Sequence, residues 1–188
     1  MANLKVLALC GSLRTNSFNK KLMLETCEEL KTQSFESTVL DLRSLSLPLY
    51  DGDLEEAEGM PIGAKKLVDA LVDADALLIA SPEYNGSITG VLKNAIDWAS
   101  RAQKNPFVNK VILLVGTSTG WWGASKANIH TRQIFNHLRA VVVPIQIAIP
   151  NAEEAFDENG RLKSEFNKNM IKGGVADLVR MTKALAGS

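Results

Sequence analysis

The stretch VLALCGSLRTNSFN, residues 6–19, decides the fold of this chain. Residues 6–10 form a continuous apolar run without the alternation of a half-exposed strand, which predicts a strand covered on both faces, as in a parallel sheet. Residues 11–19 are mainly polar and predict a loop. The apolar positions beyond the loop have helical spacing: Leu22, Met23, Cys27 and Leu30. The stretch therefore predicts a strand, a polar loop and the start of a helix in succession.

Other segments repeat these patterns. Apolar runs typical of buried strands lie at residues 76–80, 111–115 and 141–149. Residues 36–42 alternate more and predict an edge strand. Helical patterns lie between the strands, at residues 62–72, 88–99, 127–138 and 166–185. Pro61 is predicted at the first helical position of helix 62–72, Ser87 is the predicted N-cap of helix 88–99, and Gly173-Gly174 is a candidate interruption of the last helix.

The alternation of strands and helices predicts the architecture. Right-handed crossovers between parallel strands place helices on both faces of one sheet, which gives a doubly wound three-layer sandwich. Pro144 lacks the N–H that a central strand needs, so it places the last strand at a sheet edge. We predict an α/β, flavodoxin-like fold with a five-stranded parallel sheet of order 2-1-3-4-5, in a single domain over residues 1–188.

Composition narrows the function classes. Lys plus Arg and Asp plus Glu each total 21, so charge offers no argument for a nucleic-acid or anionic-membrane partner. Cys10 and Cys27 are the only cysteines, and they predict neither a disulfide framework nor a zinc site. The apolar run near Met1 is too short for a signal peptide, and no run reaches the ~20 residues of a membrane span. We expect a cytoplasmic protein.

The loop at residues 11–19 has the features of an anion site. In a sheet of order 2-1-3-4-5, ligands bind at the carboxyl ends of strands one and three, where the order reverses. The loop leads into a helix whose first N–H groups are unpaired. Ser12, Ser17 and Asn19 add neutral donors, and Arg14 adds a planar charged one. The loop matches neither the Walker nor the GxGxxG pattern. The alternative is a helix cap and turn, with Arg14 on the surface.

The segment after strand 76–80 is the second candidate. Pro82 fixes the chain as it leaves the strand, and Asn85-Gly86 is a strong turn signal. Such a turn exposes backbone groups that suit the polar edge of a flavin, and Glu83 and Tyr84 add side-chain contacts. The alternative is an ordinary strand-turn-helix corner.

A third loop, GTSTGWWG at residues 116–123, follows strand 111–115 on the same edge of the sheet. Thr117, Ser118 and Thr119 offer hydrogen bonds. Trp121 and Trp122 are predicted either to stack on a ligand or to form a subunit contact, and the contact is favoured slightly.

Three motifs carry a family resemblance: Gly11-Ser-Leu-Arg-x-x-Ser-x-Asn19, Pro82-Glu-Tyr-Asn-Gly86, and Leu92-Lys-Asn-Ala-Ile-Asp-Trp98 followed by Ser100-Arg101. With these motifs the chain resembles the NAD(P)H-dependent FMN reductases of flavodoxin-like fold, a group that includes bacterial quinone and chromate reductases. Shorter similarities at residues 47–50, 74–76 and 117–123 extend the likeness over nearly the whole chain.

The resemblance implies a bound FMN. It implies that the phosphate lies among Ser12, Arg14, Ser17, Phe18 and Asn19. It implies that the isoalloxazine lies along Pro82, Glu83, Tyr84, Asn85 and Gly86, with Ser118 near the other end of the flavin. Members are usually homodimers or homotetramers. Where the family commonly has a pair of small residues and an Arg after Ser-x-Gly, this chain has Trp121-Trp122 and Lys126. The pyridine-nucleotide contacts are therefore not carried over.

The resulting hypothesis is an FMN-dependent oxidoreductase. NADPH or NADH passes a hydride to the flavin, which reduces a small-molecule electron acceptor such as a quinone, a free flavin, an azo compound or chromate. No catalytic side chain and no metal are required. Two alternatives stay open: a flavodoxin-type electron carrier, against which Arg14 and the zero formal net charge argue, and a non-catalytic flavin-binding module.

Overall fold

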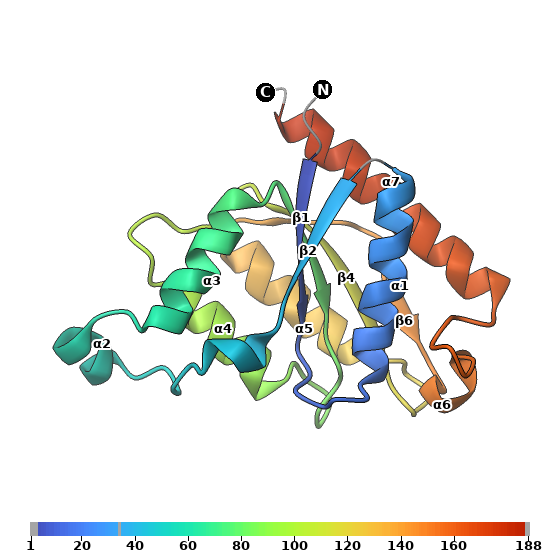
Figure 1. Ribbon diagram of the computed structural model, residues 1–188, viewed down its shortest axis with the longest axis horizontal. Helices are drawn as coiled ribbons and strands as arrows, with labels where there is room; N and C mark the ends of the chain where they lie inside the picture. The colour runs from blue at the N-terminus through green and yellow to red at the C-terminus, as the bar shows by residue number, and fades with distance from the viewer. Residues whose placement is uncertain (1–3, 34, 187–188) are drawn as a thin grey trace.

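The computed structural model describes residues 4–33 and 35–186. Its centre is a parallel sheet with the strand order β2-β1-β3-β4-β5, and a further strand, β6, also pairs with β4 (Figure 1). The strands are β1 Leu4–Cys10, β2 Phe35–Leu40, β3 Ala76–Ala80, β4 Val111–Thr117, β5 Val141–Val142 and β6 Ile147–Ile149. The predicted fold class and strand order are confirmed.

Helices cover both faces of the sheet (Figure 1). They are α1 Phe18–Thr32, α2 Gly52–Glu58, α3 Ile62–Asp73, α4 Gly90–Ala99, α5 Ser125–His137, α6 Ala152–Ala155 and α7 Glu165–Ala186, with a 3-10 helix, η1, at Leu42–Leu45. Helices α1 and α7 share a buried cluster with Val6 and Ala8 of β1. Helices α3, α4 and α5 share another with Leu7 and Leu9. Because successive side chains of β1 from Val6 onward enter opposite cores, residues 6–10 are continuously apolar.

The edge of the sheet differs from the prediction. A single strand over residues 141–149 was wrong, because the segment forms two short strands on either side of Pro144, which cannot donate to the ladder. The predicted edge position is confirmed for β5. The guanidinium of Arg132 donates to the carbonyls of Val142 at 3.2 Å and Val143 at 2.8 Å. This side chain satisfies carbonyl groups that an interrupted edge leaves without a neighbouring strand.

Helix α4 begins later than predicted. Its N-cap is Thr89, whose hydroxyl accepts from the N–H of Leu92 at 3.4 Å, and not Ser87. Ser87 instead closes a turn with Tyr84. Helix α7 runs through Gly173-Gly174 without interruption. A Cβ at Gly174 would lie 2.7 Å from Cδ1 of Ile147, so this glycine lets α7 lie close to the sheet.

Candidate functional site

The three candidate loops meet at the carboxyl ends of β1, β3 and β4, the lower edge of the sheet in Figure 1. They enclose a cavity of about 140 Å³. Its lining residues are Ser12, Arg14, Ser17, Phe18, Asn19, Pro82, Glu83, Tyr84, Thr117, Ser118 and Thr119. The structure thus brings together every predicted cofactor-binding residue except Asn85 and Gly86, which lie in the turn that continues from Tyr84.

The first loop presents donors and positive charge to the cavity. Ser17 is the N-cap of α1, and its hydroxyl accepts from the N–H of Lys20 at 3.3 Å. The hydroxyl of Ser12 accepts from the N–H of Arg14 at 3.3 Å. Ser12 and Ser17 are buried, whereas Arg14 is exposed and forms no ion pair with the described carboxylates. The helix N-terminus and the guanidinium together favour an anion here.

Asn19 has a role that the sequence did not predict. Its Nδ2 donates to the carbonyl of Thr117 at 2.8 Å, and its Oδ1 accepts from the N–H of Thr117 at 3.0 Å. Asn19 is only 4 % exposed. Its amide therefore ties the start of α1 to the end of β4, and one N–H remains for another acceptor. No local pattern signals this contact, because it joins residues 98 positions apart.

The second loop contains the predicted Asn85-Gly86 turn. Both residues have positive φ, 52° and 74°. The backbone groups of Tyr84 and Ser87 bond to each other at 3.0 and 3.1 Å, so the two central peptide groups lie outside the hydrogen bonds of the turn. The hydroxyl of Thr89 donates to the carbonyl of Gly11 at 2.7 Å, which holds this segment against the first loop.

Glu83 caps a helix. Its Oε2 accepts from the N–H groups of Lys126 at 3.0 Å and Ala127 at 3.4 Å. These groups belong to the first turn of α5, whose own N-cap residue, Ala124, has no side chain that can accept. The carboxylate therefore positions α5 and the third loop.

The third loop is firmly held although its tip is exposed. Ser118 donates from its N–H to the carbonyl of Ile149 at 3.3 Å and accepts from Ala152 at 3.0 Å. Gly123 has φ 55°, and a Cβ there would lie 2.6 Å from the carbonyl carbon of Ile149. Only glycine permits this approach. Trp121 and Trp122 at the tip are 80 % and 66 % exposed.

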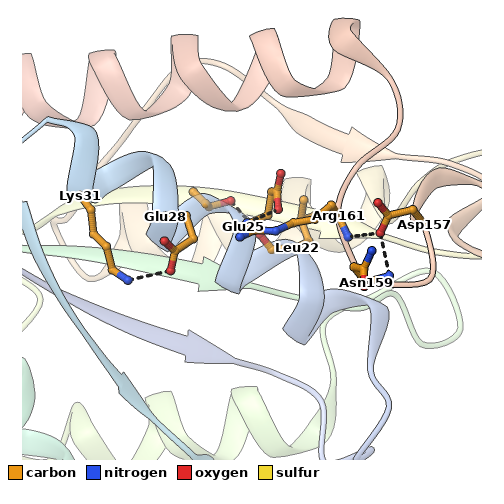
Figure 2. Close-up of polar contacts among 8 residues, drawn as sticks. Leu22, Glu25, Glu28, Lys31, Asp157, Asn159 and Arg161 are labelled. Atoms are coloured by element: carbon orange, nitrogen blue, oxygen red, sulfur yellow. Dashed lines mark hydrogen bonds and ion pairs between the residues drawn. The ribbon is translucent and has the colours of Figure 1, made fainter.

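A hairpin at residues 156–162, between α6 and α7, packs against α1. The carboxylate of Asp157 accepts from the N–H groups of Asn159 at 2.9 Å and Arg161 at 2.8 Å, and Arg161 forms an ion pair with Glu25 of α1 at 2.8 Å (Figure 2). Phe156, at the base of the hairpin, stacks on Phe18 with ring centroids 6.0 Å apart. This packing positions the residue that follows the N-cap of α1.

Cys10 and Cys27 are both buried, and that burial raises the pKa of both thiols. We expect iodoacetamide at pH 8 to alkylate the native protein at least about tenfold more slowly than it alkylates free cysteine, because the thiolate is the nucleophile. Mass spectrometry before and after addition of denaturant measures this difference. Rapid alkylation of either residue in the native protein would contradict it.

The part of the chain that the structure describes contains neither a candidate metal site nor a candidate membrane-spanning helix. No group of three or more His, Cys, Asp or Glu side chains is arranged to hold a metal ion there. Among those same residues, no helix combines the length and apolar character needed to cross a bilayer.

Comparison with known proteins gives the family. A family model for NADPH-dependent FMN reductases matches residues 4–154. The chain is 36 % identical to an NAD(P)H-dependent FMN reductase of Pseudomonas aeruginosa over 188 residues, 98 % of each protein. It is 39 % identical to a quinone reductase of Escherichia coli over 140 residues, 74 % of this chain and 73 % of that one.

A solved structure agrees with these matches. The flavoenzyme FerB of Paracoccus denitrificans, an NAD(P)H:(acceptor) oxidoreductase, superposes with a TM-score of 0.83 and 30 % identity, covering 96 % of this chain and 98 % of FerB. The resemblance predicted from the sequence motifs is confirmed. The chain belongs to the NADPH-dependent FMN reductase family.

Proposed function

We propose that this protein is an FMN-dependent oxidoreductase that oxidises NADPH or NADH and reduces a small-molecule acceptor. One observation carries the proposal: the three loops of a family member converge on one cavity that combines Arg14, buried serine hydroxyls and a helix N-terminus. FMN, when bound, would supply the redox chemistry, which is acceptance of a hydride from the nicotinamide and transfer of electrons to the acceptor. The protein contributes binding, orientation and electrostatics.

The residues of the cavity fit FMN. Arg14, the hydroxyls of Ser12 and Ser17 and the first N–H groups of α1 suit a phosphate. The central peptide groups of the Asn85-Gly86 turn suit the polar edge of a flavin ring. The proposed binding set is Ser12, Arg14, Ser17, Phe18, Asn19, Pro82, Glu83, Tyr84, Asn85, Gly86 and Ser118. Within it, Asn19 and Glu83 act chiefly by holding the loops in register.

The names of the relatives support a reductase over the two alternatives. An electron carrier or a passive flavin-binding module does not account for similarity to FMN and quinone reductases. The exposed Arg14 and the zero formal net charge also differ from the strongly acidic surface of flavodoxin-type carriers. A quinone is the first acceptor to test, ahead of free flavins, azo compounds and chromate.

We also propose a cytoplasmic homodimer or homotetramer with no nucleic-acid or membrane partner. Leu49 is 81 % exposed although its loop is well fixed. The carbonyl of the preceding residue, Pro48, accepts from Nδ2 of Asn94 and Nε1 of Trp98, both at 2.8 Å. A single exposed leucine is common on monomers as well, so the proposal of an oligomer rests on the family resemblance.

The first test is spectroscopic. We expect the purified protein to take up FMN, and NADPH or NADH to bleach the bound flavin in the absence of oxygen. Reoxidation by an added quinone then completes the cycle. A yellow protein that resists both nicotinamides would favour the electron carrier. A colourless protein that takes up no added FMN would refute the proposal.

The second test concerns the phosphate. We expect Arg14→Ala to weaken FMN affinity about tenfold or more, because a charge-assisted hydrogen bond to phosphate is lost, with little change in Tm. Fluorescence titration of the apoprotein with FMN measures the affinity. Arg180→Ala on α7, where Arg180 pairs with Asp177 on the surface, is the matched control and should bind FMN normally. Equal FMN affinity in both variants would place Arg14 outside the site.

A further inference from the structure

We infer that Trp121, Trp122 and Lys126 form a subsite for the adenine nucleotide half of NADPH or NADH. This inference rests on the proposed function, because it concerns the substrate that would deliver electrons to the flavin bound in the cavity. It assigns a ligand to the part of the third loop that departs from the usual family sequence.

The three residues lie at the margin of the cavity. Ser118 and Thr119 line it, whereas Trp121 and Trp122, further along the same loop, do not. The ammonium of Lys126 lies 5.6 Å from the ring centroid of Trp122. A Cβ at Gly86 would lie 3.7 Å from Cδ of Lys126. Lys126 therefore bridges Trp122 and the turn that we propose to border the flavin, so this surface begins where the flavin site ends.

The loop that presents the two indoles is preorganised. The N–H of Ser125 donates to the carbonyl of Trp122 at 2.8 Å, and Gly123 and Asn151 both donate to the carbonyl of Gly120, at 3.3 and 3.4 Å. Glu83 caps Lys126 from the second loop. Large aromatic side chains on a loop held in this way stack on a planar ligand at a small cost in conformational entropy.

This surface carries a cationic group without an ion-pair partner among the described residues. The ammonium of Lys126 forms no hydrogen bond or ion pair within residues 4–33 and 35–186. The carboxylate of Glu83 is bonded to this segment, but it accepts from two backbone N–H groups and not from the ammonium. An exposed indole beside a free ammonium, with a second exposed indole next to it in the sequence, suits a flat ring that carries phosphate.

The dimensions of the substrates favour a dinucleotide over a quinone. To exchange electrons, either ligand must place its reactive ring against the bound flavin. A simple quinone ends there, whereas the dinucleotide continues outward through its pyrophosphate to the adenosine. A surface of indoles and an ammonium at the margin of the cavity can therefore contact the adenine and a phosphate while the nicotinamide lies against the flavin. Lys126 suits equally the pyrophosphate, present in both nicotinamides, and the 2′-phosphate, present only in NADPH.

The test uses FMN-loaded protein and two probes that lack nicotinamide, ADP and 2′,5′-ADP. We expect both to bind, as measured by calorimetry, and to quench the fluorescence of the exposed tryptophans, since the third tryptophan, Trp98, is fully buried. Replacing both Trp121 and Trp122 by leucine should weaken binding about tenfold, the loss expected when base stacking on an aromatic side chain is removed. The KM for the nicotinamide should rise by a similar factor, with kcat at saturation and the KM for a quinone unchanged.

A second variant, Lys126→Met, separates the charge from the rings. We expect it to weaken binding of the probes and to reduce the salt dependence of their affinity. A larger loss for 2′,5′-ADP than for ADP would assign Lys126 to the 2′-phosphate. A larger loss for ADP, the one probe of the two that carries a pyrophosphate, would assign it to the pyrophosphate, and an equal loss would assign it to the 5′-phosphate that both probes share. Matched controls are Phe166→Leu, an exposed aromatic on α7, and Lys66→Met, an exposed lysine on α3, and both should bind the probes as the wild type does.

Other outcomes would overturn the inference. Unchanged probe affinity in both Trp121→Leu/Trp122→Leu and Lys126→Met would remove the subsite. If the Trp121→Leu/Trp122→Leu variant binds the probes normally but has a raised KM for the quinone, the indoles contact the acceptor. If it binds the probes normally but has a lower sedimentation coefficient, the indoles form a contact between copies of the chain. Failure of the proposed function has a different result: wild-type protein without flavin, or with flavin that neither nicotinamide bleaches.

Discussion

Asn19→Ala is expected to lower the free energy of unfolding by about 3 kcal/mol, because it leaves the buried N–H and C=O of Thr117 without their partner. For a chain of this size the loss corresponds to a fall in Tm of about 6 to 12 °C. The start of α1 would also lose its link to β4, so FMN affinity should fall even though Asn19 contributes at most one free N–H to a ligand. Thermal unfolding and FMN titration measure the two effects.

Asn16→Ala is the matched control for this variant. Asn16 lies in the same loop but is exposed, and we expect its replacement to change Tm by less than about 2 °C, as is usual for surface substitutions. If Asn19→Ala unfolds at the wild-type temperature, the amide of Asn19 does not support the loop, and direct contact with FMN becomes its main role.

Gly63→Ala is expected to be at least as damaging, although helix propensity alone predicts the opposite. Gly63 lies in α3, where alanine usually stabilises by about 1 kcal/mol relative to glycine. A Cβ at this position would lie 1.8 Å from the carbonyl oxygen of Leu45, at the end of η1. Neither backbone can move without disturbing the core, so we expect a net loss of about 3 kcal/mol, measurable by urea denaturation.

Gly90→Ala provides the opposite case. Gly90 is the first residue of α4, and a Cβ there would meet no other atom within 4 Å. We expect unchanged stability or a gain of up to about 1 kcal/mol. Wild-type stability in Gly63→Ala would mean that α3 shifts away from η1 at little cost, and the close approach would then not be a requirement of the fold.

Much of the site could be predicted because its loops follow parallel strands. A buried strand is recognised by its continuous apolar run, and the carboxyl ends of parallel strands lie at one edge of the sheet. Residues 11–19, the turn after β3 and the loop after β4 were therefore expected together before any contact was known, and the structure places them around one cavity. The positive φ of Asn85 and Gly86 follows from local sequence as well, because Asn-Gly favours that conformation.

The partners of individual polar side chains could not be predicted. The bonds by which Glu83 caps α5, 43 positions away, were not predicted. Ser87 was expected to cap α4, but Thr89 does so and also bonds to Gly11, 78 positions away. Several donors and acceptors of each kind compete for such contacts, and the choice among them depends on distances that exist only in the folded chain.

By itself the sequence determined the fold class, the strand order, the turn at Asn85-Gly86 and the edge of the sheet where the three candidate loops meet. Hydrophobic periodicity and turn chemistry act over a few residues, so they can be recognised without coordinates. Only the tertiary structure decided that Asn19 bonds to Thr117, that Pro144 divides the last strand, and that the ammonium of Lys126 lies beside the indole of Trp122. These features depend on packing between segments that are far apart in the chain. Burial removes water from the polar groups of these segments, so each group must bond to a partner that the fold brings within hydrogen-bonding distance.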